Sequence, residues 1–347
     1  MAKPILYDQS SESFQAILRE LGQPSFRLNQ LEEGLYQHRY MSFGEFSTLP
    51  KSLLGALDER FTLFPLIKEK AITSRDKQTE KFLFKLQDDN FIETVLMHYE
   101  GRHTVCISTQ VGCPMGCVFC ATGQMGYTRN LTAGEILSQI IYCMRRLAED
   151  GKDLTNVVYM GMGEPFLNYE EVMNSIARLT DQKGLNFGAR RITISTVGIL
   201  PRVCQFTEAK SQVNLALSLH APNDALRSKL VPSNEFYPLL SLIEASKKYT
   251  DYTHRRVLIE YALIDGVNDT IAHADELATL LRGMLCLVNL IALNPSQDGG
   301  LKGSPREKVE AFRDRLMKRG IQTTIRLKRG IEINAGCGQL ATIQKGK

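Results

Sequence analysis

The spacing of hydrophobic positions changes along the chain. Over residues 10–62 apolar side chains recur three and four positions apart, as in "ESFQAILRELG" and "LNQLEEGLYQH", which predicts amphipathic helices. The next two runs, "EKFLFKL" and "NFIETVLMHY", alternate instead and are separated by "QDD", which predicts a β-hairpin. We therefore expect a helical domain at residues 1–64 and a hairpin region at residues 65–104.

From residue 105 to residue 347 short apolar runs alternate with amphipathic helical stretches. This pattern predicts an α/β domain whose parallel sheet is covered by helices. About six such units are too few for an eight-fold barrel, so we expect an open or partial barrel with ligands at the carboxyl ends of its strands. The expected strands are "TVCIS", "NVVYMGM", "RITIS", "NLALSL", "RVLIEYALI", "LVNLIAL" and "TTIRL".

Composition narrows the class of protein only slightly. The chain has 347 residues, of which 43% are hydrophobic, and a formal net charge of +4, which permits a nucleic-acid partner without demanding one. No apolar run reaches the length of a membrane span, and the first residues, "MAKPILYDQSSESF", lack the apolar core of a signal peptide. We therefore expect a soluble cytoplasmic protein with no membrane partner.

Three of the eight cysteines, Cys113, Cys117 and Cys120, form a C-x3-C-x2-C run directly after the first expected strand of the barrel. Structural zinc sites and most iron–sulfur clusters take four protein ligands, and no fourth Cys or His follows closely. Three thiolates on a [4Fe–4S] cluster would leave one iron open for a substrate or cofactor. Two alternatives stay open: three buried inert thiols, and a zinc site with a distant fourth ligand.

Polar residues recur where the expected strands end, as in the lining of a barrel mouth. "GMGEP" is not a dinucleotide fingerprint, because Phe166 stands where the third glycine would be. In isolation Glu164 would fit a solvated turn, and His220 would fit a hydrogen-bonded structural histidine. The residues at these strand ends are Gly161, Gly163, Glu164, Ser195, Ser218, Leu219, His220 and Asn294.

The cysteine run, with the aromatic Phe119 before its last Cys, resembles the radical S-adenosylmethionine superfamily. Further segments, in the same order and spanning roughly residues 10–345, resemble its RlmN/Cfr group of adenosine methyltransferases. The resemblance implies a partial (β/α)6 barrel preceded by a helical domain and a β-hairpin. The segments are "CISTQVGCPMGCVFCATG", "GMGEPFLNY", "RRITISTVGILP", "LALSLHAPNDALRSKLVP", "NLIALNP" and "GIEINAGCGQLA".

The resemblance also implies roles for particular residues. Cys113, Cys117 and Cys120 would bind one [4Fe–4S] cluster, with S-adenosylmethionine on its fourth iron. Residues matching cofactor contacts of the family are Gly163, Glu164, Ser195, Ser218, Leu219, His220 and Asn294.

The same resemblance assigns Cys337 as the methyl carrier, Cys106 as the thiol that resolves the product through a disulfide, and Glu93 as a proton-accepting carboxylate. Without the resemblance, Glu93 would be a charged residue on the outer face of a hairpin strand. The remaining thiols are expected to be ordinary core or surface groups: Cys143, Cys204 and Cys286.

The implied reaction consumes two molecules of S-adenosylmethionine, one to methylate Cys337 and one to start radical chemistry on that methyl group. The implied substrates are an adenosine in the peptidyl-transferase centre of 23S rRNA, methylated at C2, and the adenosine 3′ of the anticodon in some tRNAs. A stacked adenine must be unstacked to react. We expect a monomer reduced by a donor such as flavodoxin. The expected phosphate contacts of the helical domain are Arg27, Arg39, Lys51, Lys68, Lys70, Arg75 and Lys77.

The chain departs from the group's pattern beside the carrier. Glu332 and Asn334 replace two Asp residues, Gly336 replaces an Ala, and Ser233 stands where an apolar residue is expected. These departures bear on the RNA target. Two alternatives to C2 methylation remain. The first is methylation at C8 or of another RNA, and the second is a zinc-stapled RNA-binding protein without catalysis.

Overall fold

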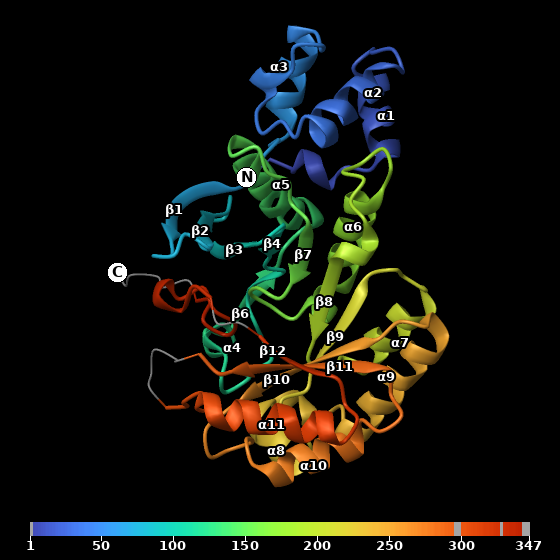
Figure 1. Ribbon diagram of the computed structural model, residues 1–347. Coiled ribbons are helices and arrows are strands. Elements are labelled where there is room, and N and C mark those ends of the chain that lie inside the picture. Colours follow the sequence, from blue (N-terminus) through green and yellow to red (C-terminus); the bar gives the residue numbers. More distant parts are fainter. Residues whose placement is uncertain (1–2, 295–299, 327–328, 342–347) are drawn as a thin grey trace.

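The computed structural model describes residues 3–294, 300–326 and 329–341. Figure 1 shows helices of the N-terminal region at one end of the molecule and a strongly twisted sheet through the rest, with further helices packed along it.

The N-terminal region is helical, as its periodicity predicts. The hydroxyl of Ser10 caps the first helix by accepting the backbone N–H of Ser13. Phe14 and Leu18, four positions apart, bury the inner face of that helix. The expected boundary at residue 64 stays a prediction. The elements are η1 (Leu6–Asp8), α1 (Ser11–Glu20), α2 (Arg27–Glu32), η2 (Glu33–Gln37), η3 (Phe43–Glu45) and α3 (Lys51–Arg60).

One sheet of ten strands runs through the rest of the described chain, in the order β1-β2-β3-β4-β7-β8-β9-β10-β11-β12. Pairs from β4 onward are parallel, and the pairs before it are antiparallel. The strands are β1 (Ile67–Thr73), β2 (Thr79–Lys85), β3 (Phe91–Tyr99), β4 (Arg102–Cys106), β7 (Asn156–Tyr159), β8 (Ile192–Thr196), β9 (Asn214–Ser218), β10 (Val257–Leu263), β11 (Cys286–Ala292) and β12 (Thr323–Ile325).

The expected partial barrel is confirmed. Every one of the seven predicted strands is present, and the last of them, β12, has only three residues. The predicted hairpin is formed by β2 and β3, and β3 pairs in turn with β4, so one sheet continues from the hairpin into the barrel. The expected boundary at residue 104 stays a prediction. Strand β1 was not predicted. Its sequence "IKEKAIT" is mostly exposed, so it lacks the alternation of apolar and polar residues that marks a half-buried strand.

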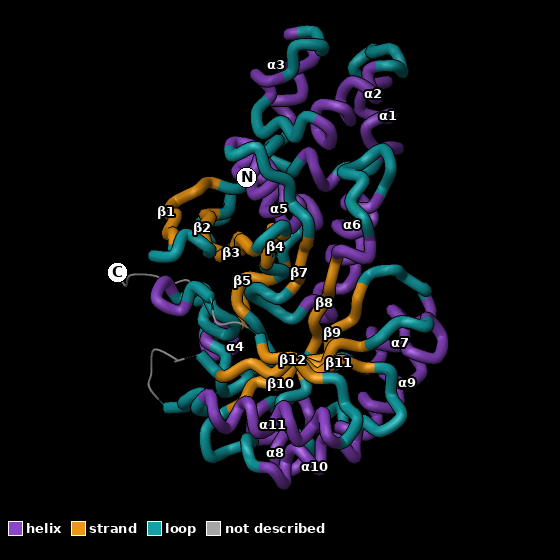
Figure 2. The backbone as a smooth tube through the Cα atoms, viewed as in Figure 1, coloured by secondary structure: helices purple, strands orange, loops and turns teal. Residues whose placement is uncertain are grey.

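Helices connect the parallel strands and lie outside the sheet (Figure 2). The predicted helix "TAGEILSQIIYCMRRLAED" begins with a capping box, in which Thr132 and Glu135 bond each other's backbone N–H. The helices are α5 (Ala133–Glu149), α6 (Tyr169–Thr180), α7 (Leu200–Glu208), α8 (Asp224–Leu230), α9 (Leu239–Thr253), α10 (Ile271–Leu280) and α11 (Arg306–Lys318).

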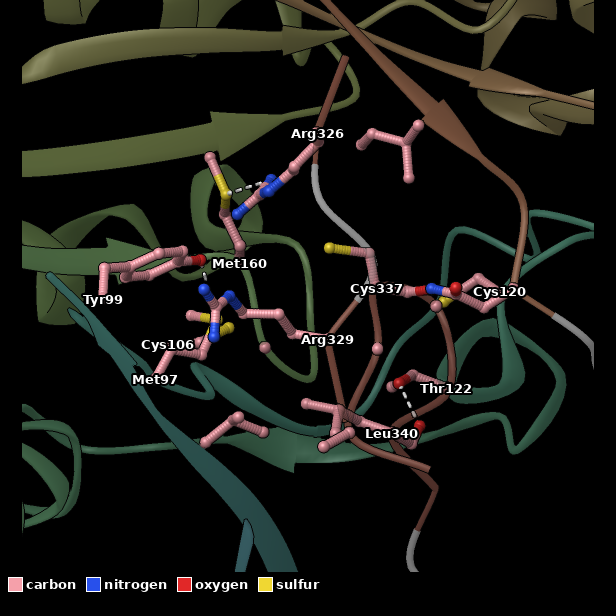
Figure 3. A pocket seen from close by; sticks show the side chains of 17 residues that line it. Met97, Tyr99, Cys106, Cys120, Thr122, Met160, Arg326, Arg329, Cys337 and Leu340 are labelled. Carbon is pink, nitrogen blue, oxygen red and sulfur yellow. Dashed lines mark hydrogen bonds between the residues drawn. The ribbon is translucent and has the colours of Figure 1, made fainter. Parts of the chain in front are cut away.

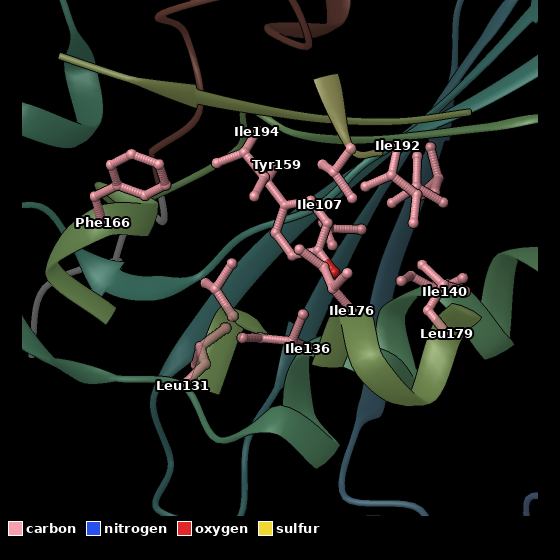
Figure 4. Packing of buried hydrophobic residues seen from close by; sticks show 14 of the residues in the cluster. Ile107, Leu131, Ile136, Ile140, Tyr159, Phe166, Ile176, Leu179, Ile192 and Ile194 are labelled. Atoms are coloured by element: carbon pink, nitrogen blue, oxygen red, sulfur yellow. The ribbon is translucent and has the colours of Figure 1, made fainter. Parts of the chain in front are cut away.

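The main hydrophobic core lies between the parallel strands and these helices. Figure 4 shows Ile192 and Ile194 of β8 and Tyr159 of β7 packed towards Ile136 and Ile176 of the covering helices. All five side chains are buried. The candidate site lies at the carboxyl ends of these strands.

No helix among the described residues combines the length and the apolar character that a membrane span requires.

Candidate active site

The three clustered cysteines follow the first parallel strand, as predicted. Cys113 and Cys117 are buried and Cys120 is half-buried. Gly112 has φ of 75°, and a side chain there would collide with the Gly126 carbonyl, so the turn into the cysteine segment requires glycine. Three short elements enclose the segment: β5 (Gln110–Gly112), β6 (Tyr127–Asn130) and α4 (Ala121–Gln124).

Two adjoining cavities open at the carboxyl ends of the strands. We call the first the barrel cavity; its lining includes Cys113, Cys117, Phe119, Cys120, Gly163, Glu164, Ser195, Ser218, His220, Glu260, Arg326 and Cys337. We call the second the loop cavity (Figure 3); its lining includes Val95, Met97, Tyr99, Cys106, Cys120, Asn294, Arg326, Arg329, Cys337 and Leu340.

The cysteine triad fits a thiolate-bound metal cluster by its chemistry and its placement. All three thiols line the barrel cavity, on whose wall Glu164 and the strand-end serines also lie. Burial raises the pKa of the Cys113 thiol to about 12 and raises those of Cys117 and Cys120 too, so metal-free thiols stay protonated and a bound cation would stabilise the thiolates. Among the described residues no group of three or more His, Cys, Asp or Glu side chains is placed to hold a single metal ion.

Gly163 and Glu164 form a tight corner after β7. Gly163 has φ of 102°, and a side chain there would lie 2.6 Å from the Gln110 side chain. The Glu164 carboxylate accepts the backbone N–H groups of Phe166 and Val197, each at 2.9 Å. Burial raises the pKa of Glu164 to about 7, so a ligand cation beside it would stabilise the ionised form.

The strand-end residues of β8 and β9 gather at the barrel cavity. The hydroxyls of Ser195 and Ser218, on adjacent strands, are 3.1 Å apart. His220 follows, and its Nδ1 accepts the backbone N–H of Ala262 at 3.0 Å, so Nε2 carries the proton. Burial, with Arg227 nearby, lowers the pKa of His220 to about 3 and keeps the ring neutral. Leu219, a predicted cofactor contact, is fully buried in the main core. It is not among the described residues that line either cavity.

Glu260 is a site residue that the sequence reasoning missed. It lies in the middle of β10 and is 4% exposed, and it lines the barrel cavity. Its Oε1 accepts the Asn289 amide at 2.9 Å, whereas its Oε2 has no hydrogen-bond partner among the described residues and lies 3.6 Å from Nη1 of Arg326. The available signal was a charged residue inside the apolar run "RVLIEYALI".

Cys337 lies on the wall between the two cavities. It belongs to residues 330–341, which we call the Cys337 loop, and it is exposed. The loop docks beside the cysteine triad, because Ala121 donates its N–H to Gly338 and the Thr122 hydroxyl donates to the Leu340 carbonyl (Figure 3). Asn294, a predicted cofactor contact, lines the loop cavity and donates its amide to the Cys337 carbonyl at 3.1 Å.

Cys106 and Cys337 both line the loop cavity. Burial raises the pKa of Cys106 to about 12. All eight cysteines are free thiols, so the disulfide that the resemblance implies is not present in this state. Of the cysteines expected to be ordinary, Cys143 and Cys286 are buried and Cys204 is exposed.

Glu93 is buried under the Cys337 loop instead of lying on an outer face. Its Oε1 pairs with Nζ of Lys81 at 2.7 Å, and its Oε2 accepts the N–H of Ala341 at 3.1 Å. Burial raises the pKa of Glu93, with Lys81 opposing that shift. The simple strand-face interpretation of Glu93 is therefore wrong, because residues 340–341 cover that face.

The departures near Cys337 have local structural reasons. Asn334 has φ of 52°, a left-handed conformation that Asn tolerates well. Glu332 accepts the N–H of Arg75 at 3.1 Å, which ties the loop to the β1–β2 turn. A side chain at Gly336 would lie 2.5 Å from the Asn294 amide, so glycine permits the close approach of loop and Asn294. Ser233 is buried in η6 (Pro232–Glu235), and nothing in the structure explains its presence there.

The basic residues expected to contact RNA lie on the helical region and on β1 and its turn. Arg27 and Arg39 are half-buried, and the other five are exposed: Lys51, Lys68, Lys70, Arg75 and Lys77.

Fold and site together define a radical S-adenosylmethionine enzyme: a partial barrel with a cysteine triad after its first strand and a polar cavity at its strand ends. Sequence comparison agrees, since a family model described as the radical SAM superfamily matches residues 107–278. A structure titled a radical SAM methyltransferase, from Sphaerobacter thermophilus, is 48% identical, with a TM-score of 0.95 over 97% of this chain and 99% of that one.

Relatives named "Probable dual-specificity RNA methyltransferase RlmN" identify the particular family. The Halalkalibacterium halodurans protein is 43% identical over 97% of this chain and 93% of its own length. The Bacillus cereus (strain B4264) protein is 44% identical over 98% of this chain and 94% of its own length. The chain belongs to the RlmN family of radical S-adenosylmethionine methyltransferases and is an enzyme.

Proposed function

We propose that this enzyme methylates C2 of an adenosine in the peptidyl-transferase centre of 23S rRNA, and also of the adenosine 3′ of the anticodon in some tRNAs. One observation carries the proposal: Cys337 lines both the barrel cavity and the loop cavity. A thiol in that position can take a methyl group from a cofactor on one side and pass carbon to a base on the other. The relatives' name, a dual-specificity RNA methyltransferase, supports two RNA substrates.

In this proposal, Cys113, Cys117 and Cys120 hold a [4Fe–4S] cluster, and S-adenosylmethionine lies against Gly163, Glu164, Ser195, Ser218 and His220. Glu164, with its raised pKa, would pair with the cofactor's ammonium group. The bound groups would supply a 5′-deoxyadenosyl radical that takes hydrogen from a methyl group. The neutral His220 can donate from Nε2, since Nδ1 already accepts from Ala262.

The chain's own residues would carry the methyl group and finish the reaction. The Cys337 thiolate accepts a methyl group from a first S-adenosylmethionine by displacement. After that methyl carbon has bonded to the adenine ring, Glu93 accepts the ring proton. Cys106, on the same cavity wall, then attacks the Cys337 sulfur, so that the S–CH2 bond breaks and a disulfide is left. The freed carbon takes the proton of the Cys106 thiol to become the methyl group, and the one unpaired electron of the adduct would leave to the iron–sulfur cluster.

Methylation at C8 instead of C2 is the second candidate, and the same two-cavity placement of Cys337 supports it equally. The expected alternative of a zinc-stapled RNA-binding protein without catalysis is wrong, because the chain belongs to a family of enzymes. The electron donor, the monomeric state and the cytoplasmic location stay predictions.

The test is anaerobic purification with iron and sulfide analysis, followed by incubation with methyl-deuterated S-adenosylmethionine, a reductant and unmodified RNA. Nucleoside mass spectrometry on a 23S rRNA fragment should give deuterated 2-methyladenosine, and a tRNA transcript should give the same product. Formation of 8-methyladenosine would establish the second candidate. A protein that holds only zinc after cluster reconstitution would overturn the proposal.

A further inference from the structure

A buried ion pair joins the two strands of the hairpin beneath the Cys337 loop. Lys81 of β2 and Glu93 of β3 are joined at 2.7 Å, with their side chains only 10% and 6% exposed. Leu83 is the residue directly opposite Glu93, so Lys81 lies diagonally across the ladder on the same face. Nothing in the proposed reaction uses Lys81.

The same pair holds both ends of the segment that carries Cys337. Nζ of Lys81 also donates to the carbonyl of Asn334 at 3.1 Å, three residues before Cys337. Four residues after Cys337, the N–H of Ala341 donates to the second oxygen of Glu93 at 3.1 Å. One ammonium and one carboxylate therefore clamp the loop on either side of its cysteine.

The clamp also covers Glu93. Val95, two positions along the same strand face, lines the loop cavity together with Leu340, whereas Glu93 is not among the described residues that line it. Lys81 occupies Oε1, and Ala341 occupies Oε2. A base entering the cavity would reach Oε2 only by displacing Ala341, and Lys81 would still orient the carboxylate through Oε1.

We propose that Lys81 is a positioning residue that couples proton uptake by Glu93 to release of the Cys337 loop. This inference rests on the proposed function, in which Glu93 takes the proton from the adenine ring carbon. That proton converts the carboxylate to a neutral acid, so Lys81 loses its anionic partner. The ion pair that holds Lys81 in place is lost, which loosens its bond to the Asn334 carbonyl. The protonated carboxyl also draws back the displaced Ala341 N–H only weakly, so both ends of the loop are released. Release at this step would let the Cys337 sulfur approach Cys106.

A purely structural ion pair makes a different prediction. It would hold the hairpin and the loop in place, so removal of either partner would change stability and loop exchange but leave the chemical steps and the amount of covalent adduct unchanged. The variants that separate the two are Lys81→Met, Lys81→Gln and Glu93→Gln. The matched control is Lys85→Met on the same strand, because Lys85 pairs with the exposed Asp89.

The first readout is hydrogen exchange of the peptide spanning residues 330–341 in reconstituted enzyme without RNA. We expect exchange at least about 10-fold faster in Lys81→Met and Glu93→Gln and unchanged in Lys85→Met. Lys81→Gln, which keeps a donor without the charge, replaces Lys81→Met if the latter melts far below the wild type. A folded Lys81 variant whose loop exchanges at the wild-type rate would overturn the proposal.

The second readout is covalent protein–RNA adduct on denaturing gels during turnover. Glu93→Gln should accumulate adduct, since the ring proton has no acceptor, and the Lys81 variant should accumulate it too, because its carboxylate is no longer oriented. If Glu93→Gln turns over without adduct, the role of Glu93 in the proposed function fails, whatever Lys81 does. If only Glu93→Gln accumulates adduct, that role stands and the coupling through Lys81 is wrong.

Discussion

The side-chain amide of Asn294 donates a hydrogen bond to the backbone carbonyl of Cys337 across 3.1 Å. The contact joins the end of β11 to the middle of the Cys337 loop, two segments more than forty positions apart in the chain. Asn294 therefore holds the Cys337 loop in place, in addition to the cofactor contact that family resemblance implies.

Replacing Asn294 with Ala should loosen the Cys337 loop. A lost hydrogen bond of about 1 kcal/mol corresponds to a roughly 5-fold rise in exchange of the amides at residues 330–341. Hydrogen exchange with mass spectrometry measures this, and the peptide of α10 serves as the internal reference. Weaker S-adenosylmethionine binding with unchanged loop exchange would show that Asn294 acts on the cofactor alone.

Glu260→Gln should weaken S-adenosylmethionine binding by roughly 10- to 150-fold, because hydrogen bonds to a charged group contribute about 1.5–3 kcal/mol. Glu260 lines the barrel cavity, and its buried Oε2 has no hydrogen-bond partner among the described residues and only a 3.6 Å ion-pair contact with Arg326, so Oε2 is available to a hydroxyl or ammonium donor. The amide would keep the bond from Asn289 through its own oxygen but would turn a donor towards the ligand. Equilibrium dialysis on reconstituted protein checks this, and unaltered affinity would mean that Oε2 serves only Arg326.

Two glycine substitutions should differ in cost although both positions have positive φ. Gly266 has φ of 70° and open space around it, so Gly266→Ala should cost about 1–2 kcal/mol from backbone strain alone. Gly163→Ala adds a clash with the Gln110 backbone and side chain, which raises the expected cost to about 2–5 kcal/mol. Urea unfolding of the metal-free chain measures both, and equal costs would contradict the crowding at Gly163.

His220 should make the free energy of unfolding decrease as the pH is lowered. Its folded pKa of about 3 lies below the ordinary value of 6.5, so the folded chain binds fewer protons than the unfolded chain. The contribution is therefore complete above pH 6.5 and is lost as the pH falls from 6.5 towards 3. At pH 5.5 the loss is about 1.4 kcal/mol relative to pH 7.5. Urea unfolding at pH 5.5 and pH 7.5 should show this difference in the wild type and not in His220→Gln. An equal change of unfolding free energy with pH in both proteins would contradict a neutral buried ring.

The sequence predicted the barrel well, because near-continuous apolar strands and amphipathic helices have distinct periods. It missed β1, whose exposed residues carry no such period, and it did not predict that the hairpin pairs with the barrel sheet. Pairing of β3 with β4 depends on backbone hydrogen bonds between strands, which no side-chain pattern records.

For the site, the order of residues along the chain determined the cysteine triad and the strand-end positions, because parallel strands bring their carboxyl ends to one edge whatever lies between them. Tertiary structure alone decided what meets across the sheet. It put Cys337 between two cavities, brought Asn294 onto its carbonyl, and buried Lys81 and Glu93 under the loop. Those contacts join residues far apart in the chain, and only the folded backbone sets the distances between them.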